Sequence, residues 1–327
     1  MTTLTWTGGG NNRASNPDDW SPNQAPAPGD TLLMQGQGTP YAIDIRGDDL
    51  AGNPLTLLFA EVTANLSHRA VASLNGTGAS GTFNLSHRST LTSEVSQGEG
   101  VYNLSGRSTL NLGGAESAST INISGRATAI LGANQSGYRS SYTVNLDQYA
   151  KWSGTFDAFG AISGQVVVNG AEGSRFDNNG ASSVDYARAT IGADVVGAGS
   201  FNIVSSPSSR IEFMKSVGRN QSISDGGFVQ VDRPDLFRAT VTLDAAQSGL
   251  PAPEIDLMNL AAADSYTFKN DMLKIFSGDQ VIDKLHLHDS TQHGFVVEAP
   301  TAGGAVKIVA ITDPTHAPAG LPLHGMV

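Results

Sequence analysis

The chain has 327 residues, of which 15% are charged, 7% are aromatic and 38 are glycine, and it contains no cysteine. So few charges exclude a coiled coil or a helical bundle, which is rich in Glu, Lys, Leu and Arg, and the lack of cysteine excludes disulfides and cysteine-ligated metal sites. The formal net charge of −11 argues against general binding to nucleic acid or to an anionic membrane surface.

Residues 1–54 are predicted to form a cap at the N-terminal end of the fold. They are rich in glycine and proline, and they contain two of the three tryptophans, Trp6 and Trp20. Bulky apolar side chains of this kind would either close the open end of a narrow core or anchor a second copy of the chain. We therefore expect Trp6 and Trp20 to act as a plug or as assembly residues.

The N-terminal residues also bear on location. The first 20 residues have neither the basic stretch nor the apolar stretch of a Sec signal peptide. No apolar run in the chain approaches the roughly 20 residues that a membrane-spanning helix needs. We expect no membrane span and, for a chain outside the cell, an export route without a visible Sec signal.

Residues 55–235 contain an internal repeat. Its clearest copies place an asparagine at every nineteenth position: Asn65, Asn84, Asn103 and Asn122. Looser copies follow at Asn145, Asn169 and Asn202. Apolar and polar residues alternate within each copy, which is typical of a β-strand, and 19 residues are too few for a pair of helices. The repeat predicts an all-β fold, a single-stranded β-solenoid (β-helix) with coils of about 19 residues.

Each clear copy ends in an arginine. Coils stacked at the β spacing of about 4.8 Å would place these arginines one above another, in a column of Arg69, Arg88, Arg107 and Arg126. One interpretation is a basic stripe for an acidic partner, either a polysaccharide or an acidic face of another copy. The other is a solvated face, partly neutralised by Glu94, Glu99 and Glu116 from the following turns.

The repeated asparagines also have two interpretations. Asn65, Asn84, Asn103 and Asn122 each open an Asn-X-Ser triplet, which is formally a glycosylation sequence. Glycans on adjacent coils would collide at the β spacing, whereas amide side chains in register would hydrogen-bond to one another and stiffen the stack. We therefore predict a structural ladder at these positions.

Residues 236–311 are predicted to form a small β-rich module, because charges become denser there and alternating strand patterns recur. His286 and His288 would project from one face of a strand and, together with His293, they form a weak metal-binding pattern. We interpret them as surface histidines. Residues 312–327, which are rich in proline, are predicted to be a flexible tail.

Several short segments resemble a known group of proteins. They are Trp6-Thr7-Gly8-Gly9, Asp19-Trp20-Ser21-Pro22, Pro28-Gly29-Asp30-Thr31 and, in the C-terminal module, Glu254-Ile255-Asp256-Leu257. With the 19-residue coil, they resemble bacterial secreted β-solenoid proteins, namely autotransporter-like passengers and filamentous-haemagglutinin-like adhesins and matrix proteins. The resemblance implies an extracellular or cell-surface location and a role in adhesion or in a biofilm matrix.

The regular coils lack the paired carboxylates that glycoside hydrolysis requires. Our first hypothesis is therefore a non-enzymatic extracellular structural protein, which associates end to end with itself into surface or biofilm-matrix filaments or acts in adhesion. The alternatives are a polysaccharide-active β-helix enzyme, either a lyase or a glycoside hydrolase, and a non-catalytic carbohydrate-binding solenoid.

The expected partners follow from these hypotheses. They are a second copy of the chain, bound head to tail, and a polysaccharide, but not nucleic acid. We expect no catalytic residues, no metal and no cofactor. The sequence contains no acidic, glycine-rich nonapeptide array, so nothing in it supports calcium binding.

Overall fold

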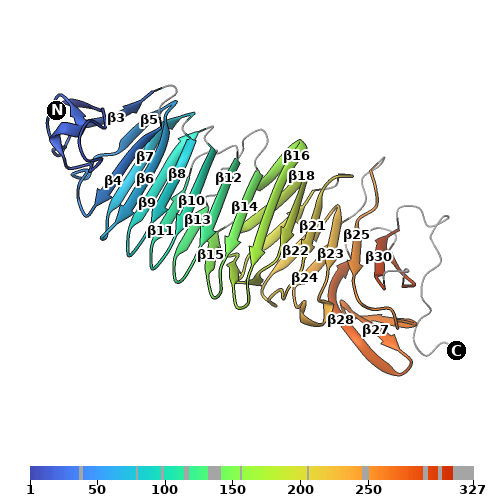
Figure 1. Cartoon of the computed structure of the whole chain (residues 1–327). Coiled ribbons are helices and arrows are strands. Elements are labelled where there is room, and N and C mark those ends of the chain that lie inside the picture. Colours follow the sequence, from blue (N-terminus) through green and yellow to red (C-terminus); the bar gives the residue numbers. More distant parts are fainter. Residues whose placement is uncertain are drawn as a thin grey trace. The chain divides into compact units, whose positions relative to one another are not determined.

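The structure, a computed structural model, describes residues 1–36, 40–78, 80–96, 99–113, 118–131, 141–154, 157–204, 206–244, 250–289, 294–300 and 304–311. Strand accounts for 58% of the described residues and helix for 2%. Parallel strands stack in coils of about 20 residues, about nine turns in the described part of the chain. Figure 1 shows the strands of successive coils. The prediction of an all-β, β-solenoid fold is confirmed.

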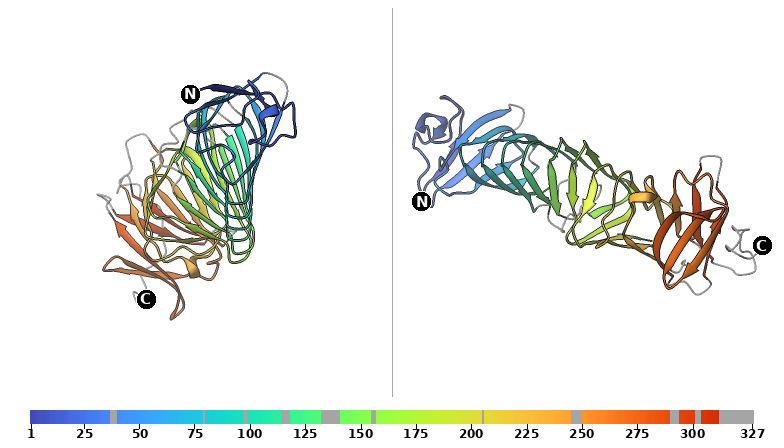
Figure 2. Two further views of the ribbon diagram at one scale, coloured as in Figure 1. Left: turned by 90° about the vertical axis from the view of Figure 1, so that its left-hand side faces the viewer. Right: turned by 90° about the horizontal axis from the view of Figure 1, so that it is seen from below.

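The chain divides into two compact units, and each is described by itself. Unit 1 comprises Met1–Phe156 with Asn169–Arg175, and unit 2 comprises Asp157–Val168 with Phe176–Val327. Each unit is built from strands that lie side by side, which the two views in Figure 2 show.

Unit 1 contains two sheets, which are parallel except for β2, and each coil supplies one strand to each sheet. The first sheet contains β1 (Thr3–Trp6), β2 (Trp20–Ser21), β3 (Thr31–Gln35), β5 (Leu55–Leu58), β7 (Val71–Thr77), β9 (Thr90–Ser96), β11 (Thr109–Leu112), β13 (Thr128–Leu131) and β15 (Lys151–Gly154). The second sheet contains β4 (Tyr41–Arg46), β6 (Glu61–Ser67), β8 (Ser80–Leu85), β10 (Glu99–Leu104), β12 (Ala118–Ile123) and β14 (Ser141–Leu146). A short 3-10 helix, η1 (Pro17–Asp19), precedes β2.

The sequence repeat sets the register of the second sheet. Asn84 lies opposite Asn65 on one side and Asn103 on the other, and the pairing continues to Asn122 and Asn145. Asn145 follows its predecessor after 23 residues instead of 19, and the register between β12 and β14 is nevertheless unchanged.

Small side chains fill one narrow corner of the core in unit 1. Ala70, Ser89, Ser108 and Ala127 occupy equivalent places in successive coils, and none is more than 1% exposed. Larger residues stack elsewhere, since the rings of Phe83 and Tyr102 lie 5.0 Å apart and nearly parallel. The alternation of apolar and polar residues thus turns one face of each strand into a thin, continuous core.

The coils begin earlier than residue 55. β3 pairs in parallel with β5, and β4 pairs in parallel with β6. Ile43 and Ile45 are buried, so β4 already presents the inward apolar pattern of the later coils without their asparagine. The cap expected over residues 1–54 is therefore shorter, and it precedes β3.

Unit 2 continues the parallel arrangement with less regular coils. It contains most of β16 (Asp157–Gly170) and β17 (Arg175–Asp177), followed by β18 (Ala181–Ile191), β19 (Asp194–Val196), β20 (Ser200–Ile203), β21 (Arg210–Phe213), β22 (Ser222–Asp225), β23 (Phe228–Val231), the 3-10 helix η2 (Pro234–Leu236), β24 (Thr240–Leu243) and β25 (Glu254–Leu257). β18 pairs with β20 through its first part and with β21 through its last part. A row of buried rings from Phe176, Phe201, Phe213 and Phe237 fills its core.

Parallel pairing also continues beyond residue 235, because β22 pairs with β24 and β23 pairs with β25. Antiparallel strands follow: β26 (Ser265–Lys269), β27 (Met272–Ser277), β28 (Gln280–Asp289), β29 (Phe295–Glu298) and β30 (Val306–Ala310). β30 lies antiparallel to β25, and β28 lies parallel to β24. The C-terminal module is thus β-rich and joined to the coils by strand pairing, and the predicted tail over 312–327 lies outside the described residues.

Candidate functional site

The repeated asparagines form a hydrogen-bonded ladder on the outer face of the second sheet. In each coil the Nδ2 group donates to the Oδ1 atom of the coil before, at 2.7 or 2.8 Å. The ladder extends past the four clear copies to Asn145 and Asn169. At its other end Asn65 donates to the carboxylate of Asp44 at 2.8 Å. Each side-chain amide in the ladder polarises the next, which strengthens the hydrogen bonds of the whole ladder.

A corner follows the ladder in each coil and holds a fixed turn. Serine hydroxyls there donate to the leucine carbonyl of the coil before, for example from Ser124 to Leu104 at 2.9 Å. The next position is left-handed in four successive coils, with φ of 54° at His68, 61° at His87, 69° at Gly106 and 66° at Gly125. The two histidine rings stack at 5.1 Å. The corner therefore keeps one geometry from coil to coil.

The four arginines of the column lie at this corner, directly after the left-handed position. All four are exposed, and the backbone N–H groups of Arg107 and Arg126 donate to His87 and Gly106 of the coil before. No hydrogen bond or ion pair joins their guanidinium groups to another side chain among the residues that the structure describes. The column spans three coil steps, roughly 14 Å.

The acids expected to neutralise this column lie elsewhere. Glu99 begins β10, whereas Arg107 follows the far end of the same strand. Glu94 lies within β9, past the corner that carries Arg88, and Glu116 falls outside the described residues. Glu94 and Glu99, although close to the column in sequence, are thus carried away from it along the strands, and a solvated, partly neutralised face stays a prediction. Neighbouring guanidinium charges at the β spacing repel by about 0.9 kcal/mol in water.

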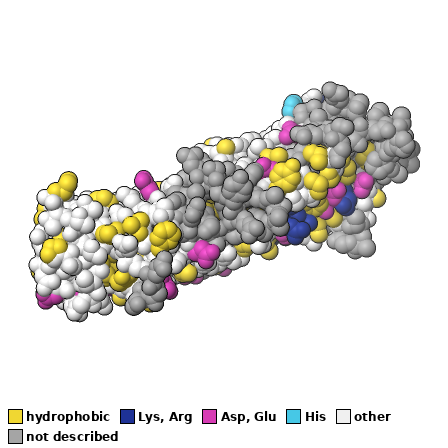
Figure 3. All heavy atoms as spheres, turned by 90° about the horizontal axis from the view of Figure 1, so that it is seen from above, with side chains coloured by type: hydrophobic (Ala, Val, Ile, Leu, Met, Phe, Trp, Pro, Cys, Tyr) yellow, Lys and Arg dark blue, Asp and Glu magenta, His cyan; other side chains and the backbone are white. Residues whose placement is uncertain are grey.

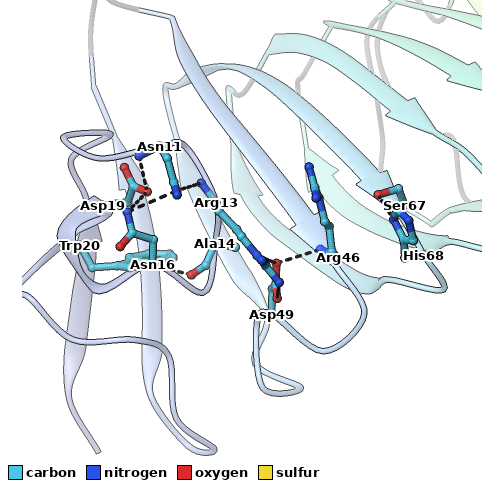
Figure 4. A network of polar contacts seen from close by, with 10 residues as sticks. All are labelled: Asn11, Arg13, Ala14, Asn16, Asp19, Trp20, Arg46, Asp49, Ser67 and His68. Carbon is cyan, nitrogen blue, oxygen red and sulfur yellow. Dashed lines mark hydrogen bonds and ion pairs between the residues drawn. The ribbon is translucent and has the colours of Figure 1, made fainter.

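Trp6 and Trp20 are both buried, with 2% and 0% of their surface exposed. Their rings meet edge to face at 4.9 Å, and the Trp20 indole N–H donates to the Ala14 carbonyl at 2.8 Å, as Figure 4 shows. Neither side chain presents apolar surface to another copy. The role of an exposed assembly anchor is therefore corrected to that of a plug at the N-terminal end.

Polar contacts hold this plug in place. The buried carboxylate of Asp19 accepts from the backbone N–H of Gly10 at 2.7 Å. It also accepts from the side chain of Asn16 at 3.0 Å, as Figure 4 shows. Arg13 pairs with Asp49 at 3.3 Å and ties the plug to the turn after β4. These groups are structural, since each contact is made within the cap or to the first coil.

His286 and His288 are exposed on the same side of β28, and His288 lies 3.5 Å from the Asp271 carboxylate. His293 lies outside the described residues. Among the described residues no group of three or more His, Asp or Glu side chains has an arrangement that would hold a metal ion.

A pair of carboxylates in unit 2 was not anticipated from the sequence. Glu254 and Asp256 project from the same side of β25, and Lys307 of β30 contacts both, at 3.7 Å in the case of Asp256. Burial and the nearby Glu254 raise the pKa of Asp256 to about 6. The spacing of two residues in a strand is the signal that places both carboxylates on one face.

Lys307 decides how this pair is interpreted. Its hydrogen bond to Glu254 raises the pKa of the lysine, so the ammonium remains charged and holds both carboxylates across the β25–β30 pairing. This arrangement suits a structural ion-pair cluster better than an acid and a base that flank a scissile bond, for which two carboxyl groups must face a substrate from opposite sides.

Comparison with family models, with curated proteins and with solved structures gave no match. Within the described ranges, no helix has the length and apolarity needed to cross a bilayer. On the face drawn in Figure 3, uncharged polar and backbone atoms prevail over much of the surface, and charged side chains are scattered.

Proposed function

We propose that the chain is a non-enzymatic extracellular β-solenoid that acts in adhesion, and that it binds an anionic polysaccharide along the arginine column. One observation carries the proposal. Four exposed guanidinium groups repeat at the β spacing, and none has a side-chain partner in the described part of the chain.

The column is suited to a repeating anion. Guanidinium groups form paired, charge-assisted hydrogen bonds with carboxylates. A sugar unit in an extended polysaccharide is close in length to the β spacing, so carboxylates of a polyuronate that face the column would meet its arginines at intervals of whole coils. Binding would also relieve the repulsion between neighbouring guanidinium groups. Several weak contacts on one polymer then act as a single multivalent contact.

An exposed aromatic ring continues the same row. The pairing of Thr128 with Lys151 places Tyr149 at the position that Arg126 holds in the coil before. Tyr149 is 71% exposed, and its ring packs against Gly173 of the following coil. The apolar face of a sugar stacks readily on such a ring, so Tyr149 would bind the polymer beyond the last arginine.

The binding experiment compares polygalacturonate with uncharged dextran of similar length, by calorimetry on the full chain. The double variant Arg88→Gln/Arg107→Gln should lose most of the affinity for polygalacturonate, and added salt should weaken binding by the wild-type chain. Arg233→Gln is the matched control, because Arg233 is an exposed arginine paired with Asp235 outside the column. Equal binding of dextran, or full binding by the double variant, would refute the proposal.

The same samples test the enzymatic alternative. Polygalacturonate incubated with the wild-type chain should keep its length, as measured by reducing ends and by absorbance of unsaturated products. A rise in either signal that is lost in Asp256→Asn would make the carboxylate pair of β25 an active site and would replace the proposal of a non-catalytic protein.

A further inference from the structure

Unit 1 has a second surface whose charge is opposite to that of the arginine column. An open groove of about 460 Å³ lies over the first residues of successive strands in the second sheet. Its described lining includes the carboxylates of Glu61 and Glu99, with the hydroxyls of Thr82 and Thr120 beside them. This volume lies within the range of small-ligand sites, about 300–1,000 Å³.

The strand register fixes the spacing of the two carboxylates. Glu61 lies opposite Ser80, and Ser80 lies opposite Glu99, so the two acids occupy one column two coils apart. Two β spacings amount to about 9.6 Å between their backbones. Thr82 and Thr120 occupy the column two residues further along the strands and are likewise two coils apart. Val101 lies between them in that column, and Thr143 follows Thr120 directly. The groove therefore holds two carboxylates two coils apart beside a row of hydroxyls that is interrupted at Val101.

Two glycines contribute backbone to the groove, because Gly81 and Gly100 lie side by side in its lining. Both hold inward positions of their strands. Gly81 is in register with the buried Val62, and a Cβ at Gly100 would lie 2.7 Å from the ring of the buried Tyr102. The outward side chains of the groove therefore belong to alternate residues, among them Thr82 and Val101.

The arginine column does not neutralise the groove. Glu61 opens β6, and Arg69 follows its other end, which places their backbones about 20 Å apart at the rise of a strand. The screening length at physiological salt is about 8 Å. Neither the Glu61 nor the Glu99 carboxylate has a hydrogen bond or ion pair with another described residue. Both carboxylates are exposed and available to a ligand.

We propose that this groove binds a second class of saccharide, an extended amino-sugar chain that carries protonated amines. Carboxylates pair with ammonium groups, and threonine hydroxyls form hydrogen bonds with sugar hydroxyls. In an extended chain whose sugars alternate in facing, every second sugar presents its amine on the same side, and this two-sugar repeat is close in length to the two-coil separation of Glu61 and Glu99. A calcium ion would need six to eight oxygen ligands, and the described lining supplies two carboxylates.

The test measures binding of a glucosamine hexamer by calorimetry in mildly acidic buffer, beside its fully N-acetylated counterpart. The uncharged hexamer should bind at least about fivefold more weakly, which is the upper effect of one exposed ion pair. Glu61→Gln/Glu99→Gln should weaken binding of the charged hexamer by at least the same factor. Glu94→Gln, an exposed glutamate on the first sheet, should leave it unchanged.

Other outcomes overturn the inference. Equal affinity for the two hexamers, or full binding by Glu61→Gln/Glu99→Gln, would exclude the groove as an ammonium site. Displacement of the hexamer by calcium alone, lost in the same double variant, would reassign the groove to a cation. Arg88→Gln/Arg107→Gln should keep the hexamer affinity, so the groove and the arginine column are tested separately. Circular dichroism of each variant establishes that the fold is intact.

Discussion

At the scale of single residues, backbone conformation decides which positions of a coil tolerate a side chain. The left-handed corner holds both His87 and Gly106, and a Cβ at Gly106 would lie 3.2 Å from backbone atoms of His87, a tight contact that a small shift relieves. Gly76 and Gly81 are different, since a Cβ at either would lie under 2 Å from a backbone oxygen of the coil beneath. Close stacking of coils, and not the turn alone, requires glycine at those two positions.

Gly81→Ala should therefore prevent folding or cost more than about 3 kcal/mol in the free energy of unfolding, because φ of 155° and a 1.9 Å contact with Val62 cannot both be relieved. Urea denaturation monitored by circular dichroism measures the change. Gly113→Ala is the control, as the nearest atoms to its new Cβ are at 3.9 Å, and it should change stability by less than about 0.5 kcal/mol. Similar behaviour of the two variants would contradict the prediction.

A buried acid makes stability depend on pH. Asp225 is fully buried at an inward position of β22, in register between Ile203 and Leu243. Its Oδ1 atom accepts from Gly227, whereas Oδ2 has no partner among the described residues. Burial raises the pKa of Asp225 well above its ordinary value, and the nearby charges of Asp244 and Glu254 add to the effect.

The sign follows from the raised pKa. Between the ordinary pKa of about 4 and the higher folded value, the folded state binds more protons than the unfolded state, so the free energy of unfolding falls as the pH rises. Asp225→Asn should reduce this fall and stabilise the chain at pH 8 relative to wild type, while the two chains converge near pH 4. Thermal unfolding across this pH range measures it. Asp256→Asn should instead remove only the part of the decrease in the free energy of unfolding that ends near pH 6. Identical pH profiles for the wild-type chain and both variants would count against this account.

At the scale of elements, the asparagine ladder and the apolar core contribute unequally to the stability of each strand. Asn103 donates to Asn84 at 2.8 Å and accepts from Asn122 at 2.7 Å, from a partly exposed position. Leu104, the next residue in β10, is only 2% exposed. Hydrogen bonds near water contribute about 1 kcal/mol each, whereas an unpaired charge in an apolar core costs far more. The inward face thus dominates the stability of the strand.

Asn103→Ala should lower the free energy of unfolding by about 1–2 kcal/mol, because two ladder hydrogen bonds are lost. Asn169→Ala, at the end of the ladder with one such bond, should lose less. Leu104→Asp should yield no folded protein. Urea denaturation separates the first two variants, and soluble yield with circular dichroism reports the third. A folded Leu104→Asp chain of normal stability would reverse the assignment of the two faces.

At the scale of the whole molecule, the N-terminal segment determines whether sheet edges are open. β1 covers β3, and β2 lies antiparallel to β1. In the second sheet, the backbone of Asn12 and Ala14 hydrogen-bonds to Asp44 of β4. Open edges would pair with another chain, and the N-terminal segment covers part of these edges, through the two-residue β2 and through the contacts at Asp44. We expect this cover to limit end-to-end association through the N-terminal end.

Deletion of residues 1–30 should expose β3 and β4 and cause association that increases with concentration. Sedimentation velocity of the deleted and the full-length chain measures it, and the full-length chain should sediment as one species at all concentrations. Concentration-dependent assembly of the intact chain would restore end-to-end association as a function.

Much of the fold was predictable because one contact repeats. The interval from Asn65 to Asn84 recurs in later coils, so a single spacing identifies the strands, their faces and their register. The burial of Trp6 and Trp20 was one of two outcomes that the sequence allowed. A bulky apolar residue near the end of the fold can close the core or can bind a second copy of the chain. The clustering of Glu254 and Asp256 with Lys307 was not predictable, because the lysine is 53 residues from Glu254 and its strand reverses direction to reach β25.

The sequence by itself determined the coil, its period, the asparagine ladder and the arginine column. Parallel stacking places residues that are a constant interval apart in the chain next to one another in space. Only the tertiary structure decided which charges lie together. The length and direction of each strand carry Glu99 away from Arg107 and bring Glu61 and Glu99 into one column. The continuation of the asparagine ladder to the Asp44 carboxylate was decided in the same way, since β4 lacks the repeat motif and joins the stack through its apolar face.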